Sequence, residues 1–438
     1  MNFDSLGLIP ELLHAVTARQ YSAPTAVQAE AIPAILAGGD VLALAQTGSG
    51  KTAAYALPLL QRLHLMQTEQ PVNATGKERK VRVLVLVPTR ELSAQVGSSI
   101  ENLACHLLPA LKIAVVFGGA SINPQMMHLR GGADIVISTP GRLLDLLDNN
   151  ALQLKDVTTL VLDEADRLLD LGFADEIKRL LSYLPEQRQN LFFSATFPPA
   201  VKKLALGLLH EPRRIAISDT IENNPDIVQR AIAVDSNKRT RLLVHLIKEQ
   251  QWERVLVFAA TKYASDTVAA KLQKAGIKAE AFNGDASQGA RQHMLTDFKA
   301  KRVQVLVATD LAARGIDVLG LPVVVNYDLP RSADDYIHRI GRTGRAGASG
   351  TAVSFILAEH EMHFRLIEKR QDKRVPREVI AGFEPAAETQ TAPQAVESAE
   401  ANKDDQSSLD APTGGIKGKR KSKKDKLREL AAKSGSHS

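Results

Sequence analysis

The chain has 438 residues, of which 44% are hydrophobic and 24% are charged, and its formal net charge is +6. That length exceeds the usual size of one hydrophobic core, so we expect two folded domains and an extension. The absence of an apolar run of about 18 residues and of a signal-like N-terminus argues against a membrane protein and favours the cytoplasm. A single cysteine, Cys105, excludes an internal disulfide and a cysteine-rich zinc site.

Short β-branched runs alternate with amphipathic segments of helical length, and the whole pattern occurs twice. Such alternation is typical of βαβ units that form a parallel sheet. In the first half, strands are expected at 41–45, 81–87, 113–117, 134–138, 159–163 and 191–194. In the second half, they are expected at 254–258, 278–282, 303–308, 323–327 and 351–356. The sequence therefore predicts two α/β domains in tandem.

Composition changes mark the domain boundaries. Residues 218–226 are polar and lack apolar periodicity, which predicts a linker between domains at 1–217 and 227–382. From residue 383 onward, too few large apolar residues remain to offset the entropy of ordering, so a disordered tail is expected at 383–438. Its part up to 412 carries seven acids against one lysine, and the rest carries nine Lys or Arg against two acids.

The segment after the first strand has the composition of a phosphate-binding loop. Its glycines let backbone N–H groups surround phosphates at a helix N-terminus, Lys51 adds positive charge, and Thr52 offers a hydroxyl to Mg²⁺. Ala45 stands where the common pattern has its first glycine. The predicted loop consists of Ala45, Gln46, Thr47, Gly48, Ser49, Gly50, Lys51 and Thr52.

An acidic segment follows the apolar run 160–162. Asp163, Glu164 and Asp166 would lie at the carboxyl end of a strand, where α/β sheets bind ligands. In phosphoryl transfer, one such acid holds the metal and another orients or deprotonates the attacking water. We assign these roles to Asp163 and Glu164. Alone, the segment could be a solvated helix start, but the loop upstream makes that interpretation the poorer one.

Further motifs occur in a family-specific order, and the chain resembles a DEAD-box RNA helicase over about residues 1–380. The resemblance implies two tandem RecA-like domains that use ATP and Mg²⁺. The motifs of the first half are PTREL at 88–92, GG at 118–119, TPGR at 139–142 and SAT at 194–196. Those of the second half are Gln288 with Arg291, ATD at 308–310, RGID at 314–317 and HRIGRTGR at 338–345.

The resemblance assigns further residues to the nucleotide. PTAVQ at 24–28 is similar to the adenine-reading Q motif, in which Gln28 would contact the base and Phe3 is the upstream aromatic residue. Gln20 replaces a common glycine in this motif. Arg342 and Arg345 would act as arginine fingers that reach the γ-phosphate when the domains close. The ribose is assigned to Gly315 and Asp317, and coupling between domains to Asp166, Ser194, Thr196 and His338.

RNA is expected across both domains through its sugar–phosphate backbone, without sequence reading. The basic cluster 417–433 would anchor RNA nonspecifically, and this contribution should fade with salt. Isolated arginines such as Arg90 or Arg142 could equally be surface ion-pair partners. By resemblance, the contacts are Pro88, Thr89, Arg90, Gly119, Thr139, Gly141, Arg142, Arg291, Thr309 and Asp310.

Within the family, the chain looks most like the bacterial RhlE group. The expected function is ATP-dependent separation of short RNA duplexes or remodelling of RNA–protein complexes, in ribosome assembly or RNA decay. We expect a monomer that meets ribosomal-precursor or decay-complex proteins. An ATP-gated RNA clamp, a catalytically inactive RNA-binding scaffold and a DNA translocase remain alternatives, which assays of strand separation and of RNA- and DNA-stimulated ATP hydrolysis would separate.

Overall fold

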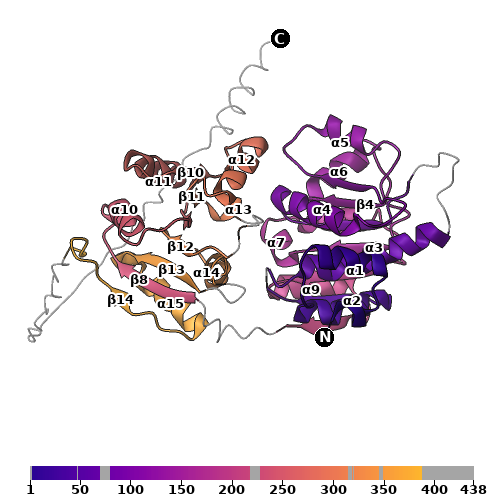
Figure 1. The fold of residues 1–438 in the computed structure, drawn as a ribbon, viewed down its shortest axis with the longest axis horizontal. Coiled ribbons are helices and arrows are strands. Elements are labelled where there is room, and N and C mark those ends of the chain that lie inside the picture. The colour runs from indigo at the N-terminus through magenta and orange to yellow at the C-terminus, as the bar shows by residue number, and fades with distance from the viewer. Residues whose placement is uncertain are drawn as a thin grey trace, which may run out of the picture. The chain divides into compact units, whose positions relative to one another are not determined.

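The computed structural model describes residues 2–46, 48–69, 79–217, 227–313, 318, 320–344 and 349–386. The predicted linker 218–226 and most of the predicted tail lie outside these ranges. Within them, two α/β lobes follow one another, the first indigo to magenta and the second pink to yellow in Figure 1. In the described part of the chain, we find no helix of the length and apolar character needed to cross a membrane.

The first lobe contains a parallel seven-stranded sheet in the order β3-β4-β2-β5-β6-β1-β7. Its strands are β1 (Val41–Leu44), β2 (Val83–Leu86), β3 (Ile113–Val116), β4 (Ile135–Ser138), β5 (Thr159–Leu162), β6 (Gln189–Ser194) and β7 (Arg213–Ala216). Its helices are η1 (Phe3–Leu6), α1 (Pro10–Ala18), α2 (Ala26–Leu36), α3 (Lys51–Glu69), α4 (Arg90–Ala104), α5 (Ile122–His128), α6 (Pro140–Asp148), α7 (Ala165–Asp170), α8 (Ala174–Leu181) and α9 (Pro199–Leu208).

The second lobe repeats this topology, with the strand order β10-β11-β9-β12-β13-β8-β14. Its strands are β8 (Ile227–Ala233), β9 (Val255–Phe258), β10 (Ala279–Phe282), β11 (Val305–Ala308), β12 (Val323–Asn326), β13 (Gly350–Ile356) and β14 (Arg377–Glu378). Its helices are α10 (Arg239–Glu249), α11 (Lys262–Lys274), α12 (Gln288–Lys299), α13 (Asp310–Ala313), α14 (Ala333–Ile340), η3 (Ala358–His360) and α15 (Glu361–Gln371).

Helices cover the sheets because the central strands are apolar on both faces, as expected of parallel strands. In the first lobe, Val83 and Val85 of β2 join one core with α2, α3 and α4, whereas Leu84 and Leu86 join the other core with α6, α8 and α9. All four side chains are buried. This alternation fixes the register of the strands, so the loops at their carboxyl ends gather at one edge of the sheet.

The ordered part of the second lobe extends slightly beyond its expected end. After β14, the Phe383 ring lies 5.3 Å from the His245 ring of α10, and the Ala386 N–H donates to Asp235. Residues 383–386 of the expected tail thus contact α10 and the residues just before it. A single aromatic residue and a few backbone hydrogen bonds hold this segment, and neither leaves a periodic sequence signal.

Candidate active site

The predicted phosphate loop connects β1 to α3. Gly48 and Gly50 adopt φ values of 83° and 94°, a left-handed region that glycine enters at no steric cost. The buried Lys51 ammonium donates to the carbonyls of Ala45 at 2.7 Å and Gln46 at 3.0 Å, so its charge lies within the loop. Thr47 lies outside the described residues. The loop therefore has the backbone and charge needed to hold phosphate groups.

Gln28 joins this loop to the start of α2. Its side-chain oxygen accepts from the Thr25 N–H at 2.9 Å in a capping box, and its amide donates to the Gly50 carbonyl at 3.2 Å. A Cβ atom on Gly50 would lie only 2.5 Å from the Gln28 amide nitrogen. The predicted adenine-reading residue is thus also a support of the phosphate loop, and its amide keeps one further hydrogen and lone pair for a base.

The structure places a second aromatic residue, Tyr21, beside the predicted aromatic residue Phe3. Phe3 is only 6% exposed, and its ring is stacked at 6.4 Å on Tyr21. Tyr21 and Gln20 line a cleft of about 560 Å³, whereas Phe3 lies behind Tyr21 and does not line it. The same cleft is lined by Gln28, Gly48, Gly50, Lys51, Thr52, Asp163, Glu164 and, from the second lobe, Arg342. Tyr21 is therefore the aromatic residue that lines this cleft, and its position just before the Q motif was the signal that could have found it.

Asp163 and Glu164 are buried where β5 ends. Asp163 accepts hydrogen bonds from the Tyr55 hydroxyl and from the Glu164 N–H, both at 2.9 Å. Burial raises the pKa of Asp163 to about 6; the nearby Lys51 charge opposes this rise and Glu164 adds to it. Glu164 has a left-handed backbone at φ 50°, and its Oε2 has no hydrogen-bond partner among the described residues.

These acids fit a Mg²⁺ ion bound mainly by phosphate and water. Among the described residues, no three His, Cys, Asp or Glu side chains come together as a metal cage. Mg²⁺ commonly uses one or two carboxylates together with substrate phosphates, so a cage is not required. A buried carboxylate of raised pKa beside a lysine and a threonine hydroxyl gains from a cation, and the residues that would hold it are Asp163 and Thr52.

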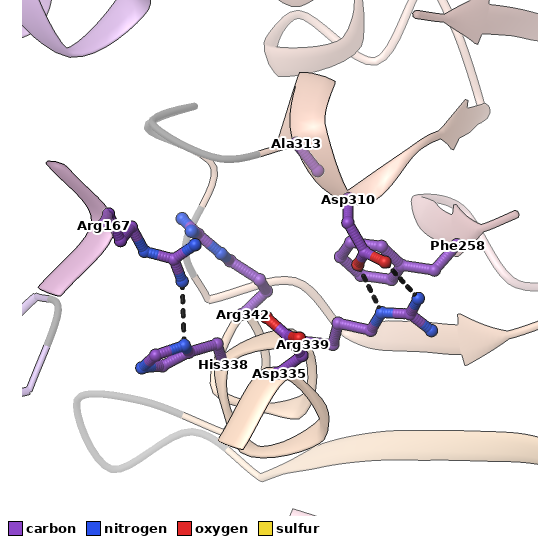
Figure 2. Close-up of a pocket in the computed structure, with 8 residues that line it drawn as sticks. All are labelled: Arg167, Phe258, Asp310, Ala313, Asp335, His338, Arg339 and Arg342. Carbon is purple, nitrogen blue, oxygen red and sulfur yellow. Dashed lines mark hydrogen bonds and ion pairs between the residues drawn. The ribbon is translucent and has the colours of Figure 1, made fainter. Parts of the chain in front are cut away.

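The predicted coupling residues divide into two groups. Asp166 accepts from the N–H and the hydroxyl of Thr196 at 2.9 and 2.8 Å, and its own N–H donates to the Ser194 hydroxyl at 3.3 Å. His338 instead interacts with Arg167, whose Nη2 lies 2.8 Å from its Nδ1 (Figure 2). Burial, reinforced by Arg167, lowers the pKa of His338 to about 4, so the ring is neutral near pH 7. The direct hydrogen-bond partner of His338 is thus Arg167.

The second lobe presents Arg342 just after α14, in a region organised by Arg339. The buried Arg339 guanidinium binds both carboxylate oxygens of Asp310 at 2.6 Å and stacks over the Phe258 ring at 4.8 Å (Figure 2). Asp310, expected at the RNA, is therefore held by a forked ion pair within its own lobe. Arg345, Gly315 and Asp317 lie outside the described residues, so their assignments stay predictions.

The predicted RNA contacts of the first lobe follow the carboxyl ends of β2, β3 and β4. Thr89 caps α4, and the Thr139 hydroxyl accepts from the Gly118 N–H at 3.3 Å. Gly119 has a φ of 71°, and a Cβ atom on it would lie 2.0 Å from the Arg90 guanidinium, so a larger residue would force the Arg90 side chain to move. Arg142 is buried and donates to the Ala120 carbonyl at 2.8 Å. Pro88, immediately before the cap of α4, and Gly141, within the first turn of α6, share this edge.

In the second lobe, Arg291 lies on α12, which follows β10, and Thr309 directly follows the neighbouring strand β11. Arg291 stacks over Phe282 at 4.8 Å and pairs with Glu91 of the first lobe at 3.2 Å. Thr309 is buried. Sequence reasoning missed Glu91 as well as Tyr55, Arg167 and Arg339, because each acts through a partner that is remote in sequence or buried.

Comparisons with known proteins agree with these motifs. A profile of the DEAD/DEAH box helicase family matches residues 25–204, and one of the helicase conserved C-terminal domain matches residues 238–347. The chain is 41% identical over 368 residues to "ATP-dependent RNA helicase DeaD" of Mycobacterium tuberculosis. The aligned region covers 84% of this chain and 63% of that protein. It is 38% identical over 375 residues to "DEAD-box ATP-dependent RNA helicase CshA" of Bacillus cereus, covering 86% and 69%.

A solved structure shows the same architecture. Saccharomyces cerevisiae Dbp5, in a structure described as bound to RNA and ADP BeF3, superposes with a TM-score of 0.75 at 30% identity. The match covers 86% of this chain and 95% of that one. Both lobes are therefore included in the comparison.

Proposed function

This chain belongs to the DEAD-box family of ATP-dependent RNA helicases, and we propose that it hydrolyses ATP to remodel RNA. The chain spans only 63% of the length of the mycobacterial relative, so activity and partners are argued from its own residues. The observation that carries the proposal is the 560 Å³ cleft, in which Lys51, Asp163 and Glu164 of the first lobe face Arg342 of the second. Charged groups of both signs and from both lobes line one cavity of nucleotide size.

The residues divide the reaction between them. Lys51 and the loop N–H groups hold the phosphates, and Glu164 is oriented to accept a proton from the attacking water. Arg342 adds positive charge to the γ-phosphate, where an arginine finger is worth roughly 10³ to 10⁵ in turnover. Thr52 and Asp163 would hold Mg²⁺, which when bound neutralises phosphate charge. Arg345 would assist Arg342, and Gly315 and Asp317 would contact the ribose.

RNA would bind at the carboxyl edges of both sheets, where the residues expected to contact its sugar–phosphate backbone lie. The small and buried side chains at these edges position a sugar–phosphate chain without reading bases. We propose local separation of short duplexes as the outcome, in ribosome assembly or RNA decay, by a cytoplasmic monomer of the RhlE kind. The solved relative described as bound to RNA supports an RNA ligand for this face.

The test compares RNA-stimulated ATP hydrolysis of the wild type with that of Glu164→Gln. Removing the proton acceptor should lower turnover by about 10² to 10⁴ while ATP and RNA still bind. Glu249→Gln, on an exposed glutamate of α10, is the matched control and should leave turnover unchanged. Wild-type turnover in Glu164→Gln would remove Glu164 from its assigned role, and no RNA stimulation in the wild type would contradict the whole proposal.

A clamp that holds RNA without separating strands is the second candidate. The ion pair between Glu91 and Arg291 joins the two lobes at the proposed RNA face. A contact of this kind does not by itself separate two strands. A short-duplex unwinding assay decides: release of the shorter strand in the presence of ATP supports the helicase, and ATP-dependent retention of intact duplex supports the clamp.

A further inference from the structure

Tyr55 is a fully buried tyrosine beside the proposed metal-holding residues. It lies on α3, one turn after Thr52, and its ring packs against Phe193 at 5.2 Å. Its hydroxyl donates to Asp163 Oδ2 at 2.9 Å. Nothing in the assigned mechanism uses this group.

The Tyr55 hydroxyl contacts Asp163, and Thr52 lies one turn earlier on the same helix. The other Asp163 oxygen accepts from the Glu164 N–H at 2.9 Å, so two donors fix the carboxylate in one orientation.

The hydroxyl is not required to build the helix or its core. Tyr55 is the fifth residue of α3, and the fifth residue of α10, the corresponding helix of the second lobe, is Leu243. Leu243 is also fully buried, so an apolar side chain serves the same packing position. Burying a hydroxyl has a cost unless it is hydrogen-bonded. The first lobe, but not the second, has a hydroxyl at this position, and it lies beside the acidic residues, which points to a polar role for Tyr55.

We propose that Tyr55 is a positioning residue that sets the affinity of the site for Mg²⁺ by orienting Asp163. This inference rests on the proposed ATPase function. Groups that orient metal ligands typically change metal affinity by about 10- to 100-fold when they are removed. The role assigned here is at the low end of that range, since the Glu164 N–H still orients Asp163 without the phenol.

The experiment replaces Tyr55 with phenylalanine, which removes one oxygen and keeps the ring. Binding of a fluorescent ADP analogue is titrated with Mg²⁺, and in parallel it is measured in EDTA without metal. The Mg²⁺ concentration at half-saturation should rise about 10-fold in Tyr55→Phe, whereas metal-free nucleotide affinity should stay within about twofold of wild type. Retained binding in EDTA also shows that the first lobe is folded.

Tyr327→Phe is the matched control. It also removes a buried tyrosine hydroxyl, which bonds to Thr240 at 3.0 Å in the second lobe, away from the acids. Its Mg²⁺ dependence should equal that of wild type. An unchanged or tighter Mg²⁺ response in Tyr55→Phe, even with lowered thermal stability, would overturn the positioning role. If wild type itself shows no Mg²⁺-dependent nucleotide binding, the proposed function fails instead.

Discussion

The two lobes have the same strand order but differ at equivalent carboxyl ends. In the first lobe, β1 leads through a loop with two left-handed glycines to Lys51. In the second, β8 leads to Arg239 through residues 234–238, which contain no glycine. After β1, a phosphate can approach the backbone closely, because glycine-rich loops expose N–H groups that side chains cover in the loop after β8.

The two lobes also differ in the acid that follows the fourth strand in the sheet order, β5 or β12. Asp163 follows β5 and has a raised pKa, whereas Asp328 follows β12 and forms an ion pair with Arg239. The Arg239 guanidinium also stacks over the Tyr327 ring at 4.4 Å. In the second lobe, an arginine thus neutralises the acid, whereas the first lobe keeps a buried acid of raised pKa. One fold supports both outcomes, so function follows from a few residues at the strand ends.

The largest expected effect comes from Gly50→Ala, which adds a methyl group to the phosphate loop of the first lobe. Alanine at φ 94° is strained, and its methyl group would displace Gln28, which holds the loop. We expect affinity for a fluorescent ADP analogue to fall by about 100-fold, equal to about 2.7 kcal/mol. Gly207→Ala is the control, because a Cβ there meets nothing within 4 Å. Equal affinities in both variants would show that the loop does not need glycine.

Most strands of the two lobes could be predicted from the sequence, but three could not. The central strands were predicted to within two residues, because β-branched runs buried on both faces leave a continuous apolar signal. β7, β8 and β14 were missed. β7 is mostly exposed, β14 has two residues, and β8 carries Gln229 and Arg230 in its interior.

At the site, contiguous motifs were predictable and remote partners were not. Lys51, Asp163 and Glu164 come together as expected, since each follows a strand of one parallel sheet. Tyr55 is 108 residues from Asp163, and Arg339 is 29 residues from Asp310. Buried hydrogen bonds between such residues depend on packing that no local pattern encodes.

The two aspartates should respond to neutralisation with opposite signs. Burial raises the folded pKa of Asp163 to about 6, above its value near 3.9 in the unfolded chain. The folded state is therefore penalised progressively as pH rises from about 4 to 6, and the penalty of about 3 kcal/mol is complete above pH 6. Asp163→Asn removes it but loses the bond from Tyr55, so urea unfolding followed by circular dichroism should show a net gain of about 1 to 2 kcal/mol at pH 7.5. At pH 4 the gain should vanish.

Asp328→Asn should instead destabilise the second lobe. Arg239 would lose its counter-charge, and hydrogen bonds to charged groups contribute about 1.5 to 3 kcal/mol. Both side chains are less than one-fifth exposed, so solvent screens this pair only weakly. Fluorescence of Trp252, the single tryptophan of the chain, reports unfolding of this lobe. Equal signs for the two variants would contradict the distinction between a ligand-ready acid and a satisfied one.

The smallest effect concerns two helix ends, one in each lobe. Gln20 after α1 and Gln251 after α10 have φ values of 56° and 51°, a conformation that costs a non-glycine residue roughly 1 to 2 kcal/mol. Glycine removes this strain but makes the unfolded chain more flexible, so Gln20→Gly and Gln251→Gly should each stabilise the protein by about 0.5 to 1 kcal/mol. Only Gln20 lines the cleft. If its replacement also lowered ADP affinity more than about twofold while Gln251→Gly did not, the Gln20 side chain would be a nucleotide contact, and the difference between the lobes would begin at α1.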